Sequence, residues 1–249
     1  MAKRKSPTDT NNQALINNQA LITDPDYAAF YGHWRRLVKT SLARTAAGRL
    51  VSVEKHPDLG SLLASLLPDE AMRKKYPDLE ARSVQEKQKQ QTGDHGPSDR
   101  KAEELKNVEV EAWICAAKYE WGKTGDNDIH VILSSNASAG AGAKFMTIEV
   151  SALPVVSATT KAKPRPTVNT RSPDYATLLR SRKQLIGLFP DRRLNDTFYK
   201  PSRPIKVTVT GSLHFDGDHT AGAANSPGPA GMKPATVWEI HPVSNLVEA

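Results

Sequence analysis

The sequence has a single cysteine, Cys115, among its 249 residues, so it forms no intramolecular disulfide and no thiolate metal cluster. Leu, Ile, Val and Phe together make up about one residue in five, close to the level at which chains lose order. No apolar run approaches the roughly 18 residues that cross a bilayer, and the basic start is followed by polar residues. We therefore expect a soluble, partly unfolded protein of the reducing cytoplasm, with no secretory signal and no membrane partner.

Positive charge is concentrated in one segment of the chain. The formal net charge is +7, and residues 161–206 alone carry 12 basic and three acidic residues, a net charge of +9. Such a segment favours an anionic partner, and we take single-stranded nucleic acid as the first choice, although solvation explains the segment equally well. The candidate contacts are Arg180, Arg182, Lys183, Arg192 and Arg193 for phosphates and Trp113 for bases.

The sequence of residues 1–103 predicts a tail, a helical region and a linker. Residues 1–25 contain a six-residue tandem duplication and are expected to be disordered. Apolar residues at helical spacing predict a helix over about 26–46 and a second over 59–67 that Pro68 stops, within a helical region 26–90. Residues 91–103 read as a linker. These amino-terminal helices are also candidates for docking a protein partner.

Beyond residue 103 the apolar period becomes two, which is typical of strands. Five strands are predicted, at 108–116, 129–133, 146–150, 205–215 and 237–241, the last stopped by Pro242. A helix opens at Ser172-Pro173-Asp174 and ends before Pro190, between the third and fourth of these strands. This order predicts a mainly β domain over 104–249, an oligonucleotide/oligosaccharide-binding (OB)-like barrel with a basic insertion at 154–204.

Alternation along these strands places ionisable residues on one face, opposite the apolar side chains. That face shows seven residues: Asp128, His130, Glu149, His214, Asp216, Glu239 and His241. Their oxygen and nitrogen donors suit Mg²⁺, Mn²⁺ or Zn²⁺, and the candidate ligands are His130, Glu149, Asp216, Glu239 and His241. Candidate catalytic residues are Asp216, His219 and His241. The alternatives are a solvated polar face and, for Asp216-Gly217, a tight turn.

The end of the chain resembles a group of uncharacterised bacterial proteins. These proteins pair a Gly-x-Leu-x-Phe-Asp-x-x-His stretch, here residues 211–219, with a Trp-Glu-Ile-His-Pro-Val ending, here residues 238–243. An earlier Asp/His strand of the group is matched by Asp126, Asp128 and His130. The group usually has an Arg shortly before the Thr that precedes Trp-Glu-Ile-His, whereas the nearest basic residue here is Lys233. The resemblance covers residues 108–243 and implies no activity.

Three functional hypotheses follow. The first is a binding module that holds a polyanion through the barrel and the basic insertion. The second is a divalent-metal-dependent hydrolase of phosphodiesters or related anionic substrates, in which the metal activates water. The third is a structural protein that binds a partner through its amino-terminal helices.

Overall fold

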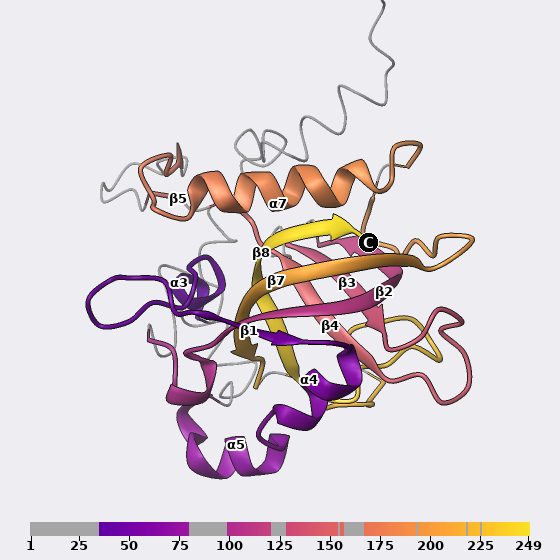
Figure 1. The fold of residues 1–249 in the computed structure, drawn as a ribbon, viewed down its shortest axis with the longest axis horizontal. Helices are drawn as coiled ribbons and strands as arrows, with labels where there is room; N and C mark the ends of the chain where they lie inside the picture. The colour runs from indigo at the N-terminus through magenta and orange to yellow at the C-terminus, as the bar shows by residue number, and fades with distance from the viewer. Residues whose placement is uncertain are drawn as a thin grey trace, which may run out of the picture.

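The protein is described by a computed structural model that covers residues 35–79, 99–120, 128–153, 155–156, 167–192, 194–217, 219–224 and 226–249 (Figure 1). The predicted tail 1–25, the first part of the predicted helix 26–46, residues 91–98 of the linker and most of residues 154–166 lie outside this range. Asp126 and Arg193 lie outside it as well.

Five strands form a closed barrel. They are β2 (Asn107–Tyr119), β3 (Ile129–Ser134), β4 (Phe145–Val150), β7 (Ile205–Phe215) and β8 (Trp238–Glu248). Their order is β2-β3-β4-β8-β7, and β2 also pairs with β7 to close the barrel. The β4–β8 pair is parallel and the other four pairs are antiparallel. The predicted OB-like barrel is therefore confirmed, with β1 (Val53–His56) as an additional strand parallel to β2.

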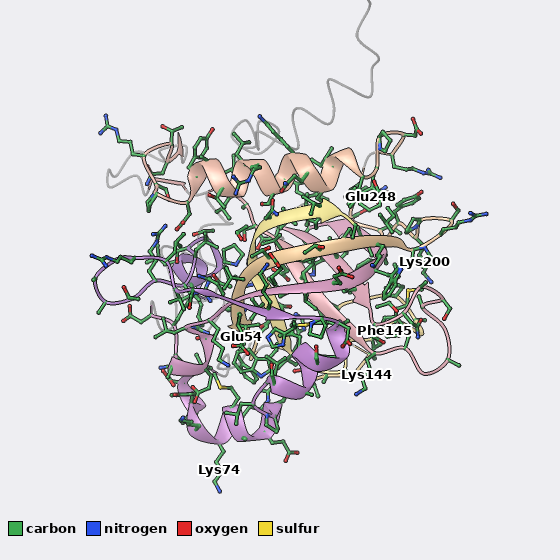
Figure 2. All side chains as sticks on the ribbon, in the orientation of Figure 1. Glu54, Lys74, Lys144, Phe145, Lys200 and Glu248 are labelled. Carbon is green, nitrogen blue, oxygen red and sulfur yellow. The ribbon has the colours of Figure 1, made fainter. Side chains whose placement is uncertain are left out.

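The barrel interior is apolar because alternate side chains of every strand point into it. Val110, Val131, Ile148, Val209 and Ile240 illustrate the pattern, and all are fully buried in one core cluster. Figure 2 shows side chains filling the space between the strands. The other faces of β3 and β4 are buried too, so an additional layer of the chain covers them.

Helices pack on two sides of the barrel. The helix α7 (Tyr175–Gly187) lies on one side, and α4 (Leu59–Ser65) and α5 (Asp69–Lys75) lie on the opposite side (Figure 1). The remaining elements are short: α3 (Arg36–Lys39), η2 (Pro77–Leu79), η3 (Ala102–Glu104), β5 (Val155–Val156) and β6 (Thr167–Val168). Buried residues of α4, α5 and α7 belong to the same core cluster as the barrel strands. None of the helices among the described residues is both long enough and apolar enough to span a bilayer.

The predicted helix over 26–46 ends earlier than expected, because α3 stops at Lys39. Two of the amides that follow bond to side chains of the barrel and of the residue preceding α7 instead of continuing the helix. The amide of Leu42 donates to Asp174 Oδ2 (3.3 Å), and the amide of Ala43 donates to Ser212 Oγ (2.8 Å). These tertiary bonds satisfy amides that a helix would have used, so tertiary contacts override the local helical pattern.

The fifth strand does not stop at Pro242, as the sequence predicted, but continues to Glu248. The register between β7 and β8 shifts around Gly211, so Pro242 lies at an irregularity where its missing N–H interrupts no regular ladder. A Cβ on Gly211 would lie 2.4 Å from the carbonyl oxygen of Pro242. Glycine is therefore required where the two strands cross most closely.

Candidate metal centre

The ionisable residues predicted on one face form a ladder across the strands. Strand register places His130 of β3 opposite Glu149 of β4, and His214 of β7 opposite Glu239 of β8. His241 follows Glu239 at the next position on the same face of β8, and Asp128 directly precedes β3. These side chains have the parity opposite to the apolar interior, so they lie on the outside of the barrel wall.

This outer face is buried, which excludes the solvated-face alternative. Asp128, Glu149, His214, Glu239 and His241 are each no more than 3% exposed. The cover comes from residues 35–43, called the strap below, and from Arg100. Ser151 at the end of β4 donates to the carbonyl of Lys39 (2.8 Å), and Arg100 donates to the carbonyls of Val38 and His241. Chain segments distant in sequence therefore enclose the polar ladder.

His241 and Glu149, with their neighbours Asp128 and His130, form the charged half of the ladder. His241 Nδ1 lies 2.9 Å from Glu149 Oε2, and its Nε2 lies 3.1 Å from Asp128 Oδ2. Burial acts to lower the pKa of His241, but Glu149 and Asp128 outweigh it and raise this pKa well above its usual value. Burial acts to raise the pKa of Glu149, but His130 (2.7 Å away) and His241 outweigh it and hold this pKa well below its usual range.

The other half is neutral. Burial, followed by the positive charges of Arg35 and His241, lowers the pKa of His214 well below its usual value. Burial and the negative charge of Glu149 raise the pKa of Glu239 to about 8. A neutral imidazole and a carboxyl group that holds a proton at neutral pH therefore lie side by side, with His214 Nδ1 3.7 Å from Glu239 Oε2.

Both ring nitrogens of His214 and Oε2 of Glu239 are buried and lack a hydrogen-bond partner. Buried polar atoms nearly always have a partner, so unpaired atoms in one place mark a candidate ligand-binding site. Glu239 Oε2 lies 3.7 Å from His214 Nδ1 and 3.6 Å from His241 Nδ1. Bonds of roughly 2.0–2.2 Å to Zn²⁺ would place tetrahedral ligands about 3.3 Å apart. His214, Glu239 and His241 each offer one donor atom, and these atoms all lie within 4.8 Å of one another, a spacing that fits one cation.

Other predicted site residues lie around these three groups. Glu149 and Asp128 both contact His241, and His130 contacts Glu149, so these residues orient His241. Asp216 and His219 form a separate pair at the end of β7, with 3.3 Å between Oδ2 and Nε2. The side chain of His219 is 30% exposed and that of Asp216 is 9% exposed, and the negative charge of Asp216 acts on Glu239.

The predicted polyanion contacts divide into buried and exposed residues. Arg182 is fully buried and donates to the carbonyls of Val150 (3.3 Å) and Ser151 (2.9 Å), so it anchors α7 to β4. The prediction that Arg182 contacts a ligand is therefore corrected. Arg180, Lys183 and Arg192 are exposed. Trp113 is half-buried on β2, between Ser134 of β3 and Lys206 of β7.

Cys115 is buried, and its Sγ donates to the carbonyl of Ile132 (3.2 Å). Burial raises the pKa of this thiol to about 11. A thiol that stays protonated is a poor nucleophile and a poor metal ligand, so Cys115 takes no part in the site.

Comparison with known proteins finds no relative. No family model, no curated protein and no solved structure matches this chain. The resemblance of residues 108–243 to a bacterial group stays a prediction.

The sequence missed three features of the site. His214 was placed on the polar face but was not singled out as a ligand, although strand parity and its partner Glu239 were the available signals. Arg100 and Arg35 carried no signal, because each acts through contacts with residues more than 50 positions away.

Proposed function

We propose that this protein binds one divalent transition-metal ion at His214, Glu239 and His241. The observation that carries the proposal is the convergence of these three buried groups from the adjacent strands β7 and β8, with one donor atom of each within 4.8 Å of the others. His214 is decisive among them, because both of its ring nitrogens lack a hydrogen-bond partner and its side chain is 1% exposed. Imidazole donors favour Zn²⁺ over Mn²⁺ and Mg²⁺, which prefer oxygen ligands and water.

A thermal melt in chelator and then in Zn²⁺, Mn²⁺ or Mg²⁺ tests the metal site. We expect Zn²⁺ to raise the melting temperature most, since a ligand at a hundredfold excess over its Kd stabilises the native state by roughly 2.7 kcal/mol. His214→Asn should lose this shift. His219→Asn removes a histidine outside the donor set and should keep it. An equal shift in His214→Asn, or none in the wild type, would refute the proposal.

A metal held there would act as a Lewis acid and would activate water, which is the chemistry of the predicted hydrolase. Asp216 and His219, which are the predicted acid/base groups, lie at the end of β7, and Asp216 acts electrostatically on Glu239. The donor atoms themselves are buried, so a substrate meets the ion only if part of the cover moves. Hydrolysis of a phosphodiester therefore stays a prediction.

Polyanion binding is the second candidate function, and a different surface supports it. α7 contains no acidic residue, and its exposed Arg180 and Lys183 are one turn apart, with Arg192 just beyond its end. Among the described residues, none of these three is in an ion pair. Six exposed or half-exposed lysines elsewhere do form ion pairs: Lys55, Lys75, Lys101, Lys106, Lys118 and Lys206. Unpaired cations along one helix favour a partner with repeated negative charge.

Anisotropy of a fluorescent single-stranded oligonucleotide, titrated at several salt concentrations, tests this candidate. The triple variant R180Q/K183Q/R192Q should bind at least tenfold more weakly and with a shallower salt dependence, by about two units of slope for three lost phosphate contacts. The matched control R49Q/K74Q/K144Q removes the same charge from exposed sites elsewhere, and Figure 2 shows Lys74 pointing away from the barrel. An equal loss of affinity in both triple variants would show that net charge alone causes the binding, and it would contradict a specific binding surface on α7.

A further inference from the structure

The strap, residues 35–43, crosses the buried cluster and is anchored at both ends. In Figure 1 its helix α3 lies beside the barrel, between α7 and α5. At one end Arg35 forms a buried pair with Glu104, with both N···O distances 2.6 Å. Just beyond the other end Arg44 pairs with Asp174 at 2.7 Å. Val38, Leu42 and Ala43 are buried between these anchors, so the strap closes the site.

Side chains, and not a strand ladder, attach the strap to the barrel. Its backbone bonds are local: the amide of Lys39 donates to the carbonyl of Arg35, the amide of Ser41 donates to that of Val38, and the carbonyl of Ala43 accepts from Val51. Its bonds to the barrel use the side chains of Asn107, Ser151 and Ser212. The barrel strands, in contrast, pair with one another through backbone bonds. The strap can therefore detach while every barrel ladder remains intact.

Arg100 joins the strap to the two strands that carry His214 and His241. Its guanidinium donates to the carbonyls of Val38 (2.8 Å) and Ser41 (2.7 Å) in the strap. The same group donates to the carbonyl of His241 (3.1 Å) in β8 and to that of Leu213 in β7. One side chain thus fixes the strap over the cluster.

The closed strap also brings positive charge to a place where a cation would bind. Lys39 and Arg35 both act on His214, and Lys39 acts on Glu149 as well. Arg35, which is paired with Glu104, acts on His214 more strongly than Lys39 does, and both residues oppose a metal cation there. Closing the strap and binding the ion therefore oppose each other electrostatically, and each weakens the other by linkage.

We propose that residues 35–43 are a gate, latched by Arg100, whose opening controls the access of ions and their ligands to the buried His/Glu cluster. The gate opens as a unit while the barrel stays folded. The part of this proposal that concerns ions rests on the proposed metal site, whereas the opening itself does not.

Hydrogen exchange of the full-length protein tests the opening without any metal. The amides of Leu42 and Ala43 are direct reporters, because they donate only to side chains across the gate. In chelator we expect them to exchange at least a hundredfold faster than the barrel amides of Ile148 and Val209. Ser151→Ala, which removes the bond to Lys39, should raise their exchange about fivefold or more, and Arg100→Gln should raise it further. Ser244→Ala is the matched control, because it removes a serine bond to the carbonyl of Thr210 within the barrel.

Stopped-flow uptake of Zn²⁺ then separates the two proposals. If the gate controls access, the uptake rate should reach a plateau at high Zn²⁺, and this plateau should rise in Ser151→Ala in proportion to the exchange of Leu42 and Ala43. Exchange of these amides as slow as that of the barrel would overturn the gate whether or not Zn²⁺ binds. Fast exchange with no uptake of Zn²⁺ would overturn the metal site and leave the opening of the strap established.

Discussion

Glu104→Ala is expected to lower the free energy of unfolding by about 3–5 kcal/mol, which is typical of removing one partner of a buried ion pair. Glu104 is fully buried and accepts from both terminal nitrogens of the buried Arg35, each at 2.6 Å. It also accepts from the amides of Lys101 (2.8 Å) and Phe215 (2.9 Å). Alanine leaves the guanidinium without its counter-ion and two amides without an acceptor. Urea unfolding followed by circular dichroism measures the loss.

The adjacent carboxylate provides the control for this measurement. Glu103 pairs with the half-exposed Lys75 at the surface. Such pairs contribute roughly 0–1 kcal/mol, so Glu103→Ala should change stability little. Similar losses in the two variants would show that the Arg35–Glu104 pair does not hold the strap to the barrel.

Glu239→Gln is expected to stabilise the protein at alkaline pH in chelator and to abolish its stabilisation by Zn²⁺. Burial and Glu149 raise the pKa of Glu239 to about 8, from the ordinary 4.5. Between these pH values the folded state keeps a proton that the unfolded state has lost, so the free energy of unfolding falls as pH rises. The contribution of Glu239 is complete below pH 4.5 and is lost as pH passes 8.

Glutamine mimics the protonated carboxyl group and never loses its proton, so the variant should lack this fall. Chemical unfolding in chelator should give nearly equal free energies of unfolding for the wild type and Glu239→Gln at pH 5. At pH 9 the variant should be the more stable of the two, by roughly a few kcal/mol. With Zn²⁺ the order should reverse, because glutamine cannot supply the carboxylate ligand. Glu248→Gln, at the exposed end of the same strand, is the control. Parallel pH profiles for Glu239→Gln and the wild type would contradict a buried, protonated Glu239.

The barrel and the membership of the polar face were predictable because both depend on local pattern. A period of two over residues 205–215 identifies β7 and assigns each side chain to a face, whatever the strand pairs with. The predicted strands 108–116, 129–133 and 146–150 lie within or close to β2, β3 and β4 for the same reason. β1 was missed, since its four residues lack an apolar pattern and pair only with a distant strand.

The roles of single charged residues were not predictable in this way. Arg182 and Lys183 are neighbours in a basic segment, yet one is buried under α7 and the other is exposed. Helical rotation separates them, but only the position of α7 against β4 decides which side is inside. The early end of α3 also depends on tertiary contacts, because the side chains of Asp174 and Ser212 accept hydrogen bonds from the amides of Leu42 and Ala43.

The sequence by itself determined the five barrel strands and the side of the wall on which His130, Glu149, His214, Glu239 and His241 lie, since strand parity is set residue by residue. Only the tertiary structure decided that this side is enclosed. The sequence pattern of a polar face is the same whether water or another part of the chain covers that face. Here the cover is supplied by residues 35–43 and Arg100, which are far along the chain from most of the strands. Enclosure leaves both ring nitrogens of His214 and Oε2 of Glu239 without hydrogen-bond partners beside His241, and that physical fact turns a polar face into a candidate metal centre.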